Sequence, residues 1–167
     1  MTEKSVKDLR AGDRVFLTGR IITMRDEAHR KFCELIMNGK ELPLCLKDQV
    51  IYYTGPAPAP EGKIIGSAGP TSSYRMDPYT PALLELGVRA AIGKGERSEE
   101  VKSSFAKHGA VYFAATGGAA VLISRTVKSV KTLAYPELGH EAVREFKVEN
   151  FPCIVAYDVH GGDIYIR

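Results

Sequence analysis

Short apolar segments alternate with helical segments along this 167-residue chain, and that alternation is the pattern of an α/β fold. Residues 15–23 are rich in β-branched side chains, as in a strand, whereas Ala28, Phe32, Leu35 and Ile36 recur at helical spacing. The expected strands are 15–23, 50–54, 63–68, 88–92, 110–115, 127–133, 143–148, 153–157 and 164–166. The expected helices are 26–39, 77–86, 98–109 and 119–123.

The length is that of one ordinary domain, so we expect residues 1–167 to form a single domain. Residues 55–62 hold three prolines within five positions and are either a domain linker or a surface loop. We expect a surface loop, because the 54 residues before it look too few for an independent core.

Charge and hydropathy exclude several classes of protein. The net charge of +3 comes without a basic run, which argues against a nucleic-acid partner. No apolar segment reaches the roughly 20 residues of a membrane helix, and the N-terminus does not resemble a signal peptide. We therefore expect a cytoplasmic protein with no membrane partner.

Three cysteines, Cys33, Cys45 and Cys153, are scattered along the chain without a CxxC pair or a zinc-like spacing. The favoured interpretation is that Cys33 and Cys153 are buried small hydrophobes in a reduced protein, and that this chain holds no metal. A metal-binding protein that uses all three cysteines remains the alternative.

Three loops each carry a cation between a predicted strand and a predicted helix. Arg25 lies in residues 23–26, Arg75 in residues 69–75 and Lys94 in residues 93–97. Loops of this kind form the ligand-binding edge of α/β sheets, and helix N-termini favour anions. The loops therefore predict a carboxylate or phosphate site, although each cation taken singly can equally be a solvated surface residue.

Other polar residues lie near these cations. Thr71, Ser72 and Ser73 are capping and turn residues by default. His29 follows Arg25 by four residues, so both can face one site, and a surface histidine is an equally good interpretation. Asp26 is expected to cap the helix that follows it.

The segment Gly69-Pro70-Thr71-Ser72-Ser73-Tyr74-Arg75-Met76-Asp77 resembles a conserved block of the class I fumarate hydratases and tartrate dehydratases. The block, Gly-Pro-Thr-Thr-x-x-Arg-Met, belongs to their β subunit or to the C-terminal domain of single-chain forms. Other matching blocks follow the family order: Leu17-Thr18-Gly19, Arg25-Asp26-x-x-His29, Gly39-Lys40-Glu41-Leu42-Pro43, Tyr52-Tyr53-Thr54-Gly55-Pro56, Gly93-Lys94-Gly95, Arg97-Ser98, Gly117-Gly118-Ala119-Ala120, Tyr135-Pro136-Glu137-Leu138-Gly139-x-Glu141-Ala142 and Phe151-Pro152.

This resemblance implies a swivelling β/β/α domain with a compact, mixed, barrel-like sheet flanked by helices. It implies reversible hydration of fumarate to L-malate, or dehydration of tartrate to oxaloacetate. It also implies a four-iron–four-sulfur (4Fe-4S) cluster held by three cysteines of an α subunit. The chain is then a β subunit that acts only with that partner on a dicarboxylate, in a hetero-oligomer such as two α with two β subunits. For the isolated chain, the alternative is a homodimer.

The resemblance also assigns roles to residues. Arg25 and Arg75 match substrate-binding arginines, and Ser72 and His29 are grouped with them. Lys94 matches an active-site lysine, and Thr71 matches the threonine proposed to remove the proton at C3. A threonine hydroxyl is a weak base at neutral pH, so Thr71 either is assisted or positions the substrate.

Some positions depart from the usual fumarase pattern, namely Ser72-Ser73-Tyr74, Glu96 and His140. Arg97-Ser98 and the block around Glu141 favour fumarate over tartrate. Three functions are therefore considered: a fumarate hydratase β subunit, an L(+)-tartrate dehydratase β subunit, and an anion-binding module of the same fold without catalysis.

Overall fold

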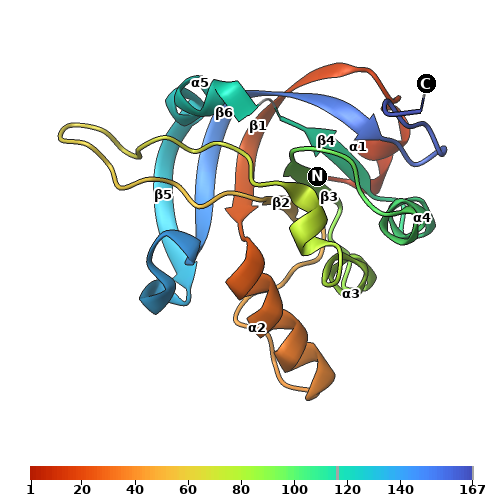
Figure 1. The fold of residues 1–167 in the computed structure, drawn as a ribbon, viewed down its shortest axis with the longest axis horizontal. Helices are drawn as coiled ribbons and strands as arrows, with labels where there is room; N and C mark the ends of the chain where they lie inside the picture. The colour runs from red at the N-terminus through yellow and green to blue at the C-terminus, as the bar shows by residue number, and fades with distance from the viewer. Residues whose placement is uncertain (116, 167) are drawn as a thin grey trace.

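A closed, barrel-like sheet forms the centre of the computed structural model, which describes residues 1–115 and 117–166 (Figure 1). The strand order is β1-β2-β3-β4-β6-β5, and an additional pairing of β1 with β6 closes five of the strands into a ring. The strands are β1 (Arg14–Thr23), β2 (Val50–Tyr52), β3 (Ala90–Gly93), β4 (Val111–Ala114), β5 (Val127–Ala134) and β6 (Val143–Tyr157). The expected mixed, barrel-like sheet with flanking helices is thus confirmed.

Strands β1 to β4 run parallel to one another, and β6 runs antiparallel to β1, β4 and β5. Strands β2 and β3 are buried at every position, as expected for parallel strands that are covered on both faces. Successive side chains alternate between two apolar clusters. Ile51 and Ala91 pack on one side of the sheet, whereas Tyr52 and Ile92 pack on the other.

Helices cover the sheet and close its ends, and α2 leads away from the end of β1 (Figure 1). Phe32 of α2, Leu83 of α3 and Phe105 of α4 belong to one apolar cluster, and Val6 of α1 and Ile123 of α5 belong to the other. The α-helices are α1 (Glu3–Lys7), α2 (Asp26–Met37), α3 (Thr80–Glu85), α4 (Glu99–Lys107) and α5 (Ala120–Thr126). The described residues also form short 3₁₀ helices, namely η1 (Ser73–Met76), η2 (Gly117–Ala119) and η3 (Pro136–Glu141).

The strand predicted at residues 63–68 is wrong, because residues 55–67 form an irregular loop that projects from the body (Figure 1). Two backbone hydrogen bonds join its arms: Ala57 N–H donates to Ser67 O (2.9 Å) and Gly66 N–H donates to Ala57 O (3.2 Å). Prolines in the first arm lack the N–H groups that a longer ladder needs. The proline-rich segment is thus a loop beside the sheet, as expected.

The C-terminal strands also differ from the prediction. The two strands expected at 143–148 and 153–157 are one continuous strand, β6, in which Asn150 takes a left-handed conformation (φ 56°). The last predicted strand, 164–166, is wrong, because only an isolated bridge joins Tyr157 to Asp163 there. Helix α1 was not anticipated. Among the described residues, no helix is long and apolar enough to cross a bilayer.

Gly93, at the end of β3, leaves no room for a side chain. A Cβ atom there would lie 1.9 Å from Ser73 Oγ and 2.8 Å from Tyr53 Cδ2. Gly93→Ala is therefore expected to lower the free energy of unfolding by about 1–3 kcal/mol through overpacking, measured by urea denaturation. Gly118→Ala is the matched control, because nothing lies within 4 Å of its Cβ position. Equal stability of the two variants would contradict this interpretation.

Candidate functional site

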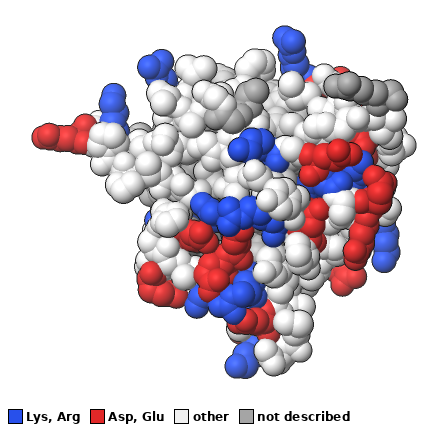
Figure 2. Space-filling model, viewed as in Figure 1, with Lys and Arg blue, Asp and Glu red and all other residues white. Residues whose placement is uncertain are grey.

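A carboxylate joins two arginines at the start of α2. Arg25 follows the end of β1, and Asp26 is the first residue of α2. Asp26 Oδ2 accepts from Arg25 Nε (3.0 Å), and Asp26 Oδ1 pairs with Arg75 Nε (2.7 Å), which comes from η1. Figure 2 shows basic and acidic side chains gathered over this end of α2. The structure thus brings together two of the cations that the sequence singled out.

Glu141 is a second carboxylate that contacts Arg25. Its Oε1 lies 3.3 Å from Arg25 Nε, and its Oε2 accepts from the Glu27 backbone N–H at 3.1 Å. The cap at the start of α2 therefore comes from η3, distant in sequence, and not from Asp26 as predicted: Arg25 occupies the N-cap position without a side-chain cap. A Cβ atom at Gly55 would come within 3.1 Å of Arg25 Cδ, so the arginine lies directly against this backbone.

Thr71, Ser72 and Lys94 lie at the same edge of the sheet. Lys94 follows β3, and an isolated parallel bridge pairs it with Ser72. The Thr71 N–H donates to Tyr53 O just beyond β2 (2.7 Å). Because β1, β2 and β3 are parallel neighbours, their carboxyl ends meet here. The three cationic loops therefore share one edge, although the loop with Arg75 does not follow a strand.

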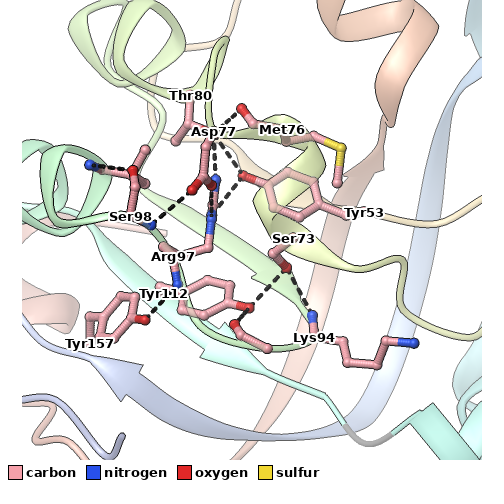
Figure 3. A network of polar contacts seen from close by, with 12 residues as sticks. Tyr53, Ser73, Met76, Asp77, Thr80, Lys94, Arg97, Ser98, Tyr112 and Tyr157 are labelled. Carbon is pink, nitrogen blue, oxygen red and sulfur yellow. Dashed lines mark hydrogen bonds and ion pairs between the residues drawn. The ribbon is translucent and has the colours of Figure 1, made fainter. Parts of the chain in front are cut away.

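Ser73 connects the two loops (Figure 3). Its N–H donates to Lys94 O (2.9 Å), and its Oγ accepts from Lys94 N–H (2.8 Å). Tyr112 Oη lies 2.9 Å from the same Oγ and 2.7 Å from Gly95 O. Ser73 is fully buried, whereas the Lys94 side chain is exposed and points away from the network. The backbone of Lys94 is thus held while its amine stays accessible.

A buried ion pair lies beneath these loops (Figure 3). Arg97 Nε donates to Asp77 Oδ1 (2.5 Å), and its Nη2 donates to Thr80 Oγ1 (2.7 Å). The guanidinium also lies 5.3 Å from the ring centroids of both Tyr53 and Tyr112. The other oxygen of Asp77 accepts from the Ser98 N–H (2.8 Å) at the start of α4. This pair ties η1 to α4 and thereby fixes the residues on either side of it.

His29 does not share a surface with Arg25, in contrast to the prediction. Its ring is fully buried against Tyr53 (centroids 5.3 Å apart), and its Nδ1 donates to Arg25 O (2.9 Å). Its Nε2 has no hydrogen-bond partner among the described residues. Burial lowers the pKa of His29 to about 4, so the ring is neutral at pH 7. The histidine supports the backbone of Arg25 from below.

The three cysteines do not form a ligand set. Cys33 lies on α2, Cys45 is exposed before β2, and Cys153 is buried within β6. Burial raises the pKa of the Cys153 thiol to about 12, which disfavours the thiolate that a metal requires. Across the described residues, no group of three or more His, Cys, Asp or Glu side chains is placed to hold a metal ion. The residues of this chain do not fit an iron–sulfur cluster.

Sequence reasoning identified the cations but missed their partners. Asp26 was interpreted as a cap, and the contact from Glu141 joins residues 114 positions apart that no local pattern relates. The Asp77–Arg97 pair was missed as well, although both residues occur in the quoted family blocks. In the sequence, the position of Asp26 directly after Arg25 was the available sign that a carboxylate could hold this arginine.

The fold and site together describe an α/β protein with a closed sheet and cationic loops at its parallel-strand edge. A family model described as the fumarase C-terminus matches residues 1–167, so the chain belongs to the fumarase C-terminus family. It is 46% identical over 154 residues (91% of the chain) to the anaerobic class I fumarate hydratase of Escherichia coli. It is 44% identical over 158 residues (93% of the chain) to fumarate hydratase 2 of Leishmania major.

The chain spans only 28% of the length of either fumarate hydratase. It is also similar to a protein of Methanocaldococcus jannaschii named as the β subunit of an L(+)-tartrate dehydratase. There the identity is 42% over 171 residues, which covers 99% of this chain and 88% of that protein. The relatives therefore include both a much longer protein and a separate subunit of similar size.

The buried imidazole of His29 makes stability depend on pH. Its folded pKa of about 4 lies below the unfolded value of 6.5, so its contribution is full above pH 6.5 and is lost as the pH falls toward 4. Between pH 7.5 and 5 we expect the wild-type protein to lose about 2 kcal/mol more stability than His29→Phe. Urea denaturation at both pH values tests this.

Between pH 7.5 and 8.5 the difference between the two proteins should stay constant, because His29 is neutral in both the folded and the unfolded state. Identical pH slopes for the two proteins below pH 6.5 would show that the imidazole takes up a proton in the folded state.

Proposed function

We propose that this chain is the β subunit of a hydro-lyase that interconverts fumarate and L-malate. The observation that carries the proposal is the arrangement of Arg25, Asp26 and Arg75 at the sheet edge that also holds Thr71 and Lys94. Membership of the fumarase C-terminus family and the similarity to fumarate hydratases support this activity.

Arg25 and Arg75 are suited to bind the two carboxylates of the substrate. Each guanidinium makes its shortest contact with Asp26 through Nε, and the N–H groups of its terminal nitrogens are the donors that would bind a carboxylate. The side chains are 18% and 44% exposed, so Arg25 is the more desolvated of the two. Ser72, whose backbone is bridged to Lys94, is a further polar group at the edge.

Thr71 and Lys94 are the candidates for proton transfer at C3. Removal of that proton builds negative charge that the adjacent carboxylate spreads and that the arginines stabilise. A threonine hydroxyl acts as a base only with help, and the accessible Lys94 amine, or its positive charge, can provide it. His29 is too deeply buried to touch the substrate and instead acts through the carbonyl of Arg25.

A second chain is part of this proposal. The chain covers 28% of the fumarate hydratases but 88% of a separate β subunit, which fits an enzyme divided between an α and a β subunit. Because the cysteines here do not fit an iron–sulfur cluster, we assign any such cluster to the α subunit. The oligomer would contain both chains.

The L(+)-tartrate dehydratase activity is the second candidate. It is favoured by the similarity to the tartrate dehydratase β subunit over nearly the full length of both proteins. Both substrates are four-carbon dicarboxylates, so the arginine pair alone does not discriminate between them. The hydroxyl groups of tartrate would have to be recognised by other polar groups.

The proposal is tested by anaerobic co-expression of this chain with candidate α subunits, followed by assays of malate, fumarate and L-tartrate. Interconversion of malate and fumarate that requires both chains is expected. Turnover of tartrate alone would favour the second candidate. A stable complex that turns over none of the three substrates would instead indicate a binding module or an untested hydroxydiacid.

Arg75→Ala is expected to lower kcat/KM of the assembled enzyme by about 100-fold or more, because one carboxylate of the substrate loses its charged partner. Arg30→Ala is the matched control: Arg30 is an exposed arginine of α2 that pairs with Glu27 and Glu34. The control should stay within about twofold of the wild-type rate. Near-normal turnover by a folded, assembled Arg75→Ala enzyme would remove Arg75 from the site.

A further inference from the structure

Asp26 divides its two carboxylate oxygens between the two arginines. Oδ2 lies 3.0 Å from Arg25 Nε, and Oδ1 lies 2.7 Å from Arg75 Nε. The side chain is 26% exposed, and it projects from the first turn of α2, where the helix dipole favours a negative charge. Two arginines from separate segments are therefore attached to one rigid helix start.

The carboxylate stays ionised. Burial alone would raise the pKa of Asp26, but the hydrogen bond from Arg25 and the charges of Arg75 and Arg25 lower it below its ordinary value. Without this negative charge, the two guanidinium groups would repel each other across a partly buried site. Asp26 thus both attracts the arginines and sets how far apart they lie.

Both contacts leave the binding ends of the arginines available. A guanidinium has five N–H donors, and each contact with Asp26 uses Nε. Within the part of the chain that the structure describes, the terminal nitrogens of Arg25 and Arg75 donate no hydrogen bond. Each can still grip a carboxylate end-on through two parallel hydrogen bonds.

We propose that Asp26 is a positioning residue that fixes the separation of Arg25 and Arg75 and thereby selects dicarboxylates by the distance between their carboxylates. This inference rests on the proposed function, in which those arginines bind the substrate. Asp26 touches no substrate itself. Asp26 instead determines which acid has the right length to contact both arginines. This effect on ligand preference differs from the effect of a general change in the charge of the site.

Glu141 offers an internal comparison. It contacts Arg25 only (3.3 Å) and uses its other oxygen to cap α2, so it supports one arginine without relating it to the second. Loss of Glu141 should therefore weaken ligands of every length alike. Loss of Asp26 should change the preference among lengths.

The test is inhibition of the assembled enzyme by saturated dicarboxylates of three, four and five carbons: malonate, succinate and glutarate. In the wild-type enzyme succinate should bind best. In Asp26→Asn we expect its inhibition constant, and KM for the substrate, to rise about tenfold or more, with a smaller change in kcat. The preference for succinate over malonate and glutarate should largely disappear.

Two variants control this result. Glu27→Gln removes a neighbouring charge from the same turn of α2, but the Glu27 side chain pairs with Arg30 and not with either site arginine, so all constants should stay within about twofold. Asp26→Glu restores the charge on a longer side chain. It should recover affinity and shift the preferred length, which a purely structural role for Asp26 would not produce.

A substrate-free measurement keeps the inference separate from the proposed function. In nitrogen-15 NMR spectra of this chain, the Nε resonances of both Arg25 and Arg75 should shift in Asp26→Asn, because each Nε lies within 3.0 Å of an Asp26 oxygen. In Glu141→Gln only the Nε resonance of Arg25 should shift. These signals could behave as expected while the wild-type enzyme neither binds nor turns over a dicarboxylate. In that case the proposed function is wrong, but Asp26 still holds both arginines.

Three outcomes would overturn the inference itself. The first is an unchanged length preference in a folded Asp26→Asn enzyme. The second is an equal loss of affinity for all three acids, which would reduce Asp26 to general charge or stability. The third is unchanged Nε resonances of both arginines in Asp26→Asn, which would show that the arginines are held by other groups.

Discussion

The buried pair of Arg97 and Asp77 is the interaction on which the geometry of the sheet edge depends. Arg97 has a fully buried side chain, and burying an unpaired guanidinium would cost several kcal/mol. It is compensated by Asp77, by the Thr80 hydroxyl and by the faces of two tyrosines. These partners come from residues 77–80, from the end of β2 and from β4, so the pair holds those segments in one arrangement.

The Arg97–Asp77 pair also helps to fix the positions of the site residues on either side of it. Asp77 ends η1, the single helical turn that carries Ser73 at one end and Arg75 near the other. Ser73 is hydrogen-bonded to the backbone of Lys94, and Arg75 forms an ion pair with Asp26. One short turn therefore relates the lysine loop after β3 to the arginine pair after β1. A shift of η1 would move both halves of the candidate site at once.

Much of the fold could be predicted, because short apolar strands and amphipathic helices have local patterns. Strands β1 to β4 and helices α2 and α4 lie close to where those patterns placed them. The strand predicted at 63–68 failed because this stretch belongs to a projecting loop whose prolines cannot support a ladder, although Ile65 and Ala68 still pack into an apolar cluster. The ring closure could not be predicted from local patterns and came only from the family resemblance, since the pairing of β1 with β6 joins residues more than a hundred positions apart.

The residues of the candidate site were likewise predicted from the sequence only in part. Cations in loops are visible in a sequence, and Arg25, Arg75 and Lys94 were found from their positions and from a family resemblance. Which carboxylate holds which arginine depends on three-dimensional packing, so Asp26 and Glu141 were not recognised as partners. His29 was expected to face the site with Arg25 or to lie at the surface, but it is buried, because helical spacing does not show how deeply a turn is buried.

The pairing of β1 with β6 also governs the order in which a growing chain can assemble. Residues 14–23 are synthesised well before their antiparallel neighbour β6, which is complete only at residue 157. Before β6 is made, one edge of β1 has no hydrogen-bonded neighbour. The cap of α2 by Glu141 likewise forms only after residue 141 has been made. The arginine pair therefore takes its final form only after Glu141 and β6 have been made, and a chain truncated before Glu141 would carry both arginines without the contact that holds Arg25.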